Sequence, residues 1–229
     1  MSVPVVCVDG PSGAGKGTLS LMLARSLGWH LLDSGALYRV LAEACSREHV
    51  KWDDVQGVTA VASALDVDFL ATDDGVTVRL SGLDITRDIR SEAGGVGASA
   101  VALIAEARQA LLVRQRELAV APGLVADGRD MGTVVFPNAP LKIFLTASAE
   151  ARANRRFLQL QARGEDVSLP RLLEGIQQRD ERDSSREVSP LTAAEDAIVI
   201  DSTSLSADGV HAKVMKLVHE RGLNARNFG

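Results

Sequence analysis

The segment from Gly10 to Thr18 constrains the fold of this 229-residue chain more than any other stretch. It reads Gly-Pro-Ser-Gly-Ala-Gly-Lys-Gly-Thr and follows Val3 to Asp9, a short apolar run that is typical of a strand buried in a parallel sheet. From Lys16 to about Leu27 the apolar residues recur at helical spacing, and Gly28 ends that helix. A strand, a turn of small residues and a helix, in this order, predict a loop that binds phosphate through backbone N–H groups and a helix N-terminus.

The lysine in this loop is typical of a site for the phosphates of a nucleotide, and we expect Lys16 to bridge the outer phosphates of ATP. The loop alone would also fit a GTPase, so the acceptor side must decide the function. A Ser or Thr that contacts Mg²⁺ usually follows this lysine, but here Gly17 follows it and Thr18 comes one step later. We therefore expect Mg²⁺ to be held mainly by phosphates and water, with no protein metal site. The alternative, a turn that only joins strand to helix, leaves the lysine unexplained. The predicted ATP-binding residues are Gly10, Pro11, Ser12, Gly13, Ala14, Gly15, Lys16, Gly17 and Thr18.

Beyond this loop, short apolar strands alternate with helices, which predicts an α/β fold with a parallel, doubly wound sheet. Between about residues 65 and 87 the apolar residues instead alternate with polar ones, as in an antiparallel meander appended to the main sheet. Further strands are expected at 30–33, 124–126, 141–145 and 197–200, and further helices at 36–45, 52–64, 98–120, 148–162, 168–184 and 206–221.

Composition excludes several classes of protein. A formal charge of −5 argues against a general nucleic-acid binder, and no apolar run reaches the roughly 20 residues of a membrane helix. The N-terminus lacks the features of a signal peptide, so we expect a cytoplasmic protein that binds no membrane. Cys7 and Cys45 match no metal-ligand spacing and are interpreted as reduced packing residues.

Arginine dominates the segment from residue 152 to residue 186, which has eight arginines and no lysine. A guanidinium offers a rigid fork of donors suited to phosphate, so the block is typical of a cover over transferring phosphoryl groups. A glycine-containing loop at 162–165 could serve as its hinge. The alternative is that many of these arginines solvate helices or pair with nearby acids. The block consists of Arg152, Arg155, Arg156, Arg163, Arg171, Arg179, Arg182 and Arg186.

Polar residues also follow two of the predicted strands. Asp127-Gly128-Arg129-Asp130 comes after one buried strand, at the sheet edge where α/β proteins bind ligands. Asp33-Ser34-Gly35, with Tyr38 and Arg39 on the next helix, follows another. Asp33 and Ser34 could equally cap that helix, and Tyr38 could equally belong to the core.

Four motifs in this order resemble those of bacterial cytidylate kinases, a family of nucleoside monophosphate kinases, and the similarity covers essentially the whole chain. The motifs are the phosphate loop already described and the segments 32–39, 126–137 and 179–183. The resemblance implies a five-stranded parallel core sheet, a small β insert and a short arginine-rich lid. The implied regions are a core at about 1–34, 123–150 and 185–229, a monophosphate-binding region at 35–122 with its insert at 65–87, a lid at 151–168, and a return to the core at 169–184.

The resemblance also implies the reaction, which is in-line transfer of the γ-phosphoryl group of ATP to CMP or dCMP without a covalent intermediate. It assigns cytosine recognition to Ser34, Arg108 and Asp130, and the acceptor phosphate to Arg39, Arg129 and Arg186. It assigns the ribose to Ser99, Arg179 and Asp183, and the lid to Arg155 and Arg156. Tyr38 is a further candidate for substrate contact because of its place after the second strand, and the residues expected to act in catalysis are Lys16, Arg129, Arg155, Arg156 and Arg186. The expected partners are these small substrates, and we expect a monomer. The alternatives are a kinase for UMP or AMP and a GTP-binding switch protein, although the chain has no Asn/Thr-Lys-x-Asp segment to read guanine.

Overall fold

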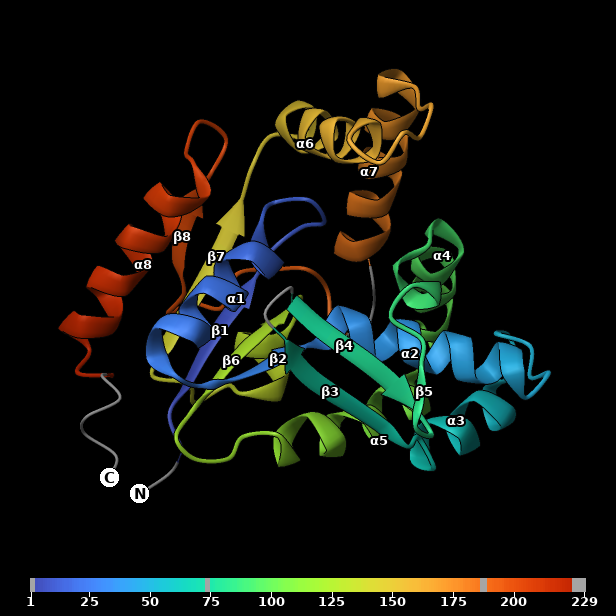
Figure 1. Cartoon of the computed structure of the whole chain (residues 1–229). Helices are drawn as coiled ribbons and strands as arrows, with labels where there is room; N and C mark the ends of the chain where they lie inside the picture. Colours follow the sequence, from blue (N-terminus) through green and yellow to red (C-terminus); the bar gives the residue numbers. More distant parts are fainter. Residues whose placement is uncertain (1–2, 73–74, 186–188, 224–229) are drawn as a thin grey trace. The chain divides into compact units, whose positions relative to one another are not determined.

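The computed structural model describes residues 3–72, 75–185 and 189–223. These residues belong to two compact units (Figure 1), one formed by Met1–Leu32 with Leu118–Gly229 and the other by Asp33–Glu117. Each unit has an apolar core of its own. Within the described residues, no single helix has the length and apolar composition needed to span a membrane.

A five-stranded parallel sheet forms the centre of the first unit, with its strands in the order β2-β6-β1-β7-β8 (Figure 1). The strands are β1 (Val5–Asp9), β2 (His30–Asp33), β6 (Leu124–Gly128), β7 (Leu141–Thr146) and β8 (Ile198–Asp201). Every residue of β1 and β6 is buried, as required of strands covered on both faces. The predicted α/β fold with a parallel sheet is confirmed.

The helices of the first unit pack partly against this sheet and partly against one another. They are α1 (Lys16–Leu27), α6 (Ala149–Gln161), α7 (Leu169–Ser184), α8 (Ala207–Glu220) and the short π-helix η2 (Met131–Val135). Leu19 and Leu23 of α1 share a core with Val8 of β1 and with Val210 and Val214 of α8. Full burial of one such leucine contributes about 2 kcal/mol, so this shared face fixes α1 and the loop before it on the sheet.

The second unit combines helices with a small antiparallel sheet of order β3-β4-β5. Its elements are α2 (Ser34–Arg47), α3 (Val55–Ser63), β3 (Val67–Thr72), β4 (Gly75–Leu80), β5 (Leu83–Asp84), η1 (Asp88–Arg90), α4 (Glu92–Val101) and α5 (Ala105–Glu117). The predicted antiparallel meander is confirmed, while residues 73 and 74 of its first turn lie outside the described residues. Leu37, Val40 and Leu41 of α2 lie at the centre of this unit's core.

The single helix predicted at 98–120 is wrong. Two helices, α4 and α5, meet there at an angle of 101°. At the break, Val101 ends α4 and Ile104 precedes α5, and both side chains belong to the core of this unit. The chain tightens at this point, where Ile104 N–H donates to the carbonyl of Val101, and the Arg108 guanidinium donates to the carbonyl of Ala102. The helical composition of this segment was therefore overridden by tertiary packing.

Candidate active site

The loop between β1 and α1 has the backbone of an anion-binding turn. Gly13 and Gly15 have φ angles of 79° and 98°, in the left-handed region that glycine adopts without strain. At Gly10 a Cβ atom would lie 2.0 Å from the carbonyl oxygen of Leu145, so a side chain cannot fit there. The N-cap residue of α1 is Gly15, which has no side chain that could cap the helix. The first N–H groups of α1 can therefore bind a phosphate.

Lys16 brings a positive charge to this loop. Its side chain is 6% exposed, and Nζ donates to the carbonyl oxygen of Pro11 at 3.0 Å. A buried ammonium is stable when opposite charge lies close to it, and the phosphates of a nucleotide would supply more of that charge. This geometry suits the predicted role of Lys16.

The position after Lys16 tests whether the loop can hold Mg²⁺. A Cβ atom on Gly17 would lie 3.5 Å from Oδ2 of Asp127, a buried carboxylate near the carboxyl end of β6. Carboxylate oxygens are preferred Mg²⁺ ligands. Within the described chain, no group of three or more His, Cys, Asp or Glu side chains is arranged to hold a metal. Asp127 is therefore a residue near this loop that could contribute a ligand to Mg²⁺.

Asp9 ends β1 and connects this strand to the segment after β6. Its carboxylate accepts hydrogen bonds from the backbone N–H groups of Met131, at 2.9 Å, and Gly132, at 2.8 Å. The pKa of Asp9 is raised to about 6, chiefly by burial and to a smaller extent by the nearby Asp130, while both N–H donors and Lys16 oppose this shift. From the sequence, Asp9 was predicted only to end a strand. A carboxylate at the end of an otherwise apolar strand was the signal available.

Arg129 and Asp183, predicted to contact the acceptor phosphate and the ribose, form an ion pair. Nε of Arg129 donates to Oδ2 of Asp183 at 3.0 Å, and the carboxylate is buried. Asp183 belongs to α7, where Arg179 lies one helical turn earlier. Asp130 is buried at the start of η2. The first unit therefore brings Arg129 and Asp183 into contact, with Asp130 next to Arg129 in the chain.

Two arginines of α6 hold the phosphate loop from outside. Arg152, only 4% exposed, donates to the carbonyl oxygen of Ser12 and forms a two-pronged ion pair with Asp180 of α7. Arg155 donates to the carbonyl oxygen of Ala14 and to Ser202. The arginine block pointed to Arg152 without giving its role, whereas no motif in the sequence pointed to Ser202.

Two further arginines were predicted to act in catalysis. Arg156 is half-buried on α6, next to Arg155. Arg186 lies outside the described residues.

The second unit holds the remaining acceptor residues. Ser34, Tyr38 and Arg39 belong to α2, Ser99 to α4 and Arg108 to α5. The Arg108 guanidinium carbon lies 5.6 Å from the centre of the Tyr38 ring, a distance at which a cation and an aromatic face attract each other. Tyr38 also packs against the core, as the alternative interpretation expected. Asp33 caps α2 by accepting the N–H of Ala36 at 2.9 Å, so the predicted cap is confirmed.

Arg39 and Ser99 both lie against Gly95 of α4. Nη1 of Arg39 donates to the carbonyl oxygens of Ile89, at 2.8 Å, and Ser91, at 3.3 Å. A Cβ atom on Gly95 would lie 3.5 Å from Nη2 of Arg39. The hydroxyl of Ser99 donates to the carbonyl oxygen of Gly95 at 3.0 Å. Two predicted acceptor residues are thus positioned by the same short stretch of helix.

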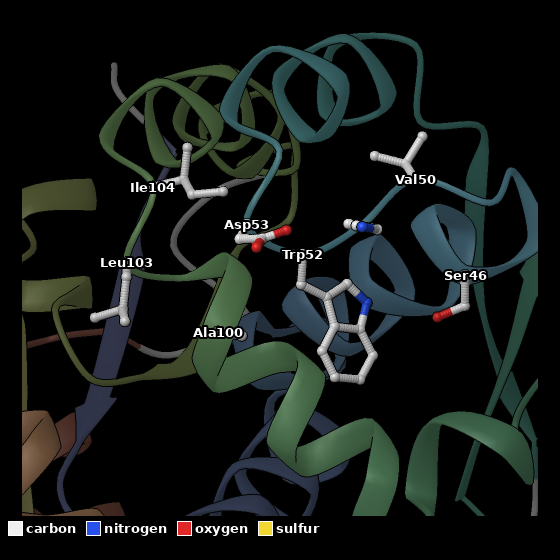
Figure 2. Close-up of a pocket in the computed structure, with 8 residues that line it drawn as sticks. Ser46, Val50, Trp52, Asp53, Ala100, Leu103 and Ile104 are labelled. Carbon is white, nitrogen blue, oxygen red and sulfur yellow. The ribbon is translucent and has the colours of Figure 1, made fainter.

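A separate apolar pocket of about 590 Å³ lies elsewhere in the second unit (Figure 2). Its lining residues are Ser46, Val50, Lys51, Trp52, Asp53, Ala100, Leu103 and Ile104. The Trp52 indole N–H donates to the carbonyl oxygen of Ala42 at 3.2 Å, which fixes the ring in the wall of the pocket. None of the predicted substrate residues lines it.

Comparison with known proteins gave clear matches. A family model described as cytidylate kinase matches residues 6–220. A protein named cytidylate kinase from Stutzerimonas stutzeri (strain A1501) is 56% identical over 223 residues, which cover 96% of this chain and 97% of that protein. Another protein of that name, from Pseudomonas paraeruginosa (strain DSM 24068 / PA7), is 55% identical with the same coverage. Among solved structures, that of TT1252 from Thermus thermophilus has a TM-score of 0.47 and 17% identity, covering 96% of this chain and 98% of that chain, too distant a likeness to support a conclusion.

Proposed function

Because this chain belongs to the cytidylate kinase family, we propose that it transfers the γ-phosphoryl group of ATP to CMP or dCMP, giving ADP and CDP or dCDP. The observation that carries the proposal is the arrangement at the carboxyl ends of two neighbouring strands. There β1 runs into the phosphate loop and β6 runs into the Asp127–Asp130 segment, with Asp9 paired to Gly128. Ligands of parallel α/β sheets bind at this edge.

The donor half of the reaction uses the phosphate loop. The N–H groups at the start of α1 and the ammonium of Lys16 bind the phosphates of ATP and stabilise charge on the transferring group. Mg²⁺, which enters with ATP, would neutralise further phosphate charge, with Asp127 as the nearby carboxylate. Arg155 and Arg156 of α6 act on the same phosphates from the lid. Arg155 can do so by exchanging its present contacts with Ala14 and Ser202 for phosphate oxygens.

The acceptor half uses the residues that the family resemblance assigns to it. Arg108 and Asp130, with Ser34, recognise cytosine, because a carboxylate accepts from the 4-amino group while a guanidinium donates to the neighbouring ring acceptor. Arg39, Arg129 and Arg186 hold the acceptor phosphate, and Ser99, Arg179 and Asp183 hold the ribose, with Tyr38 beside Arg108. Uracil has an acceptor where cytosine has its 4-amino donor, and a donor where cytosine has its ring acceptor, so it does not match these side chains. A site built in this way can reject such an analogue by several orders of magnitude.

The chemical step needs little acid–base catalysis. The attacking oxygen of the monophosphate is already ionised near neutral pH, so it needs no general base. The arginines instead neutralise repulsion between the two substrates and align the attacking oxygen with the bond that breaks. Exclusion of water by the lid would prevent hydrolysis of ATP.

An acceptor panel tests this proposal. Initial rates of ADP formation would be measured at fixed MgATP with CMP, dCMP, UMP and AMP, for the wild type and for Asp130→Ala. We expect CMP and dCMP to be preferred, and the CMP preference over UMP to fall at least tenfold in the variant. A preference for UMP or AMP in the wild type would establish one of the alternative kinases. ADP formation that no monophosphate accelerates would overturn the proposal altogether, and the switch-protein alternative would gain support if GTP replaced ATP as the tighter ligand.

We also propose that the enzyme acts as a monomer in the cytoplasm. Cys7 and Cys45 are both buried free thiols, which suits a reducing compartment. Light scattering after size exclusion would test the first point, with the mass of a single chain as the expected result.

A further inference from the structure

We propose that Asp9 is a positioning residue that holds Arg129 and Asp130 in place for binding of the acceptor nucleotide. The strand register and the side chain of Asp9 both support this role. In the sheet, the backbone of Asp9 is paired with Gly128, the residue before Arg129. Its carboxylate binds Met131 and Gly132, the two residues after Asp130. Arg129 and Asp130 therefore lie in a short segment that a single residue secures at both ends.

The chemistry of the contact requires a carboxylate. The N–H groups of Met131 and Gly132 open the short helix η2, and the first N–H groups of a helix have no partner within it. Within the described residues, no side chain caps η2 from Asp130, the position at which a cap usually stands. Asp9 supplies the missing acceptors from another strand, one oxygen for each N–H. An amide has only one oxygen and would turn an N–H₂ group toward the second donor.

The surroundings of Asp9 show that stability alone does not favour an acid here. Asp9 is 5% exposed, and the desolvation of a buried carboxylate costs several kcal/mol. The charged groups that face it are of both signs, with Lys16 of α1 favouring the ionised form and Asp130 opposing it. Lys142 of β7 also lies against Gly132, where its Cδ atom is 3.0 Å, and Oδ2 of Asp9 3.4 Å, from the place a Cβ would occupy. An apolar residue would end a buried strand at lower cost, so the carboxylate is explained by what it holds.

This inference rests on the proposed function, because it assumes that Asp130 recognises cytosine. Loss of one of the two hydrogen bonds would let the Asp130 backbone move. Its carboxylate would then no longer match the cytosine edge. Discrimination between CMP and UMP should therefore fall, while contacts common to both nucleotides are less affected.

The test compares three variants, Asp9→Asn, Asp130→Ala and the control Asp54→Asn. Asp54 also accepts a backbone N–H, that of Gly57 at the start of α3, so the control makes the same chemical change at a helix cap outside the proposed site. The measurements are kcat and KM for CMP and for UMP, and KM for ATP. We expect Asp9→Asn to lower the CMP to UMP ratio of kcat/KM by about tenfold, the upper range for one hydrogen bond, mainly through a raised KM for CMP. The control should leave the ratio unchanged.

The outcomes separate this inference from the proposed function. If Asp130→Ala leaves the ratio unchanged, the cytosine-reading role of Asp130 fails and the role of Asp9 fails with it. If Asp130→Ala lowers the ratio but Asp9→Asn slows CMP and UMP equally, the role of Asp9 alone is overturned and it is a structural residue. Should Asp9→Asn not fold, Asp9→Ser would replace it, because the smaller hydroxyl keeps one acceptor and removes the buried charge. Failure of both variants to fold would likewise make Asp9 purely structural.

Discussion

Asp9 illustrates how one ionisable residue links stability to pH in this protein. Burial raises its pKa in the folded chain from the ordinary 3.8 to about 6. The folded protein therefore binds a proton more tightly than the unfolded chain between these two pH values. For a carboxyl group with a raised pKa, this contribution to stability is fully present below pH 3.8 and is lost as pH rises through 6.

The prediction is that wild type loses stability relative to Asp9→Asn as pH rises from 4 to 6. At about 1.4 kcal/mol per pKa unit, the difference between their free energies of unfolding should change by roughly 3 kcal/mol across this range and be flat above pH 7. Urea unfolding of both proteins at several pH values provides the measurement. Because other carboxyl groups titrate alike in both proteins, they cancel in the difference. Parallel stability curves would contradict the raised pKa.

Among the secondary-structure elements, sequence pattern predicted most strands and helices but missed two features. The buried strands β1 and β6 each begin with a short apolar run, so a window of five residues was enough to predict them as strands. The break between α4 and α5 depends on Val101 and Ile104 finding a core built from other elements. The helix η2 is capped by Asp9, 122 residues from Met131. Local patterns carry no information about contacts made over such separations.

The contacts of α6 with α7 and with the phosphate loop lead to a prediction at the scale of secondary-structure elements. Arg152 is buried, pairs with Asp180 and donates to the carbonyl of Ser12. Arg152→Ala should lower the free energy of unfolding by about 3 kcal/mol, because Asp180 loses its partner in a mostly buried setting. It should also raise KM for ATP several-fold, since the loop backbone loses a donor. Thermal unfolding and steady-state kinetics measure the two effects.

An exposed ion pair provides the control for Arg152. Lys216 and Glu220 lie 3.8 Å apart on the surface of α8. Because exposed pairs of this kind contribute little, Lys216→Ala should change stability by less than about 0.5 kcal/mol and leave KM for ATP unchanged. Equal effects of the two substitutions would show that burial of the Arg152 pair does not matter.

For the molecule as a whole, the residues that bind ATP could be predicted from the sequence more fully than those that bind the acceptor nucleotide. The phosphate loop is a contiguous segment, so its residues and its chemistry could be predicted from the sequence. In the structure, its backbone has the conformation expected of an anion-binding turn. The acceptor residues are scattered from Ser34 to Arg186. Spacing alone could not group them, and their assignment came from resemblance to a family. The structure adds the contacts that the resemblance did not include, such as those of Asp9 and Arg152.

Because different residues are assigned to the two substrates, a prediction follows for how each substrate stabilises the whole protein. All residues assigned to ATP belong to the first unit, whereas the acceptor residues come from both. A ligand at one hundred times its Kd stabilises the folded state by about 2.7 kcal/mol, equivalent to a rise in Tm of about 5–10 °C for a chain of this size. Lys16→Ala should therefore lose most of the rise produced by MgATP and keep that produced by CMP. Arg39→Ala should show the reverse, because its guanidinium is assigned to the acceptor phosphate. Thermal shifts measured with each substrate alone would decide the matter, and loss of both shifts in either variant would mean that the two substrates do not depend on separate sets of residues.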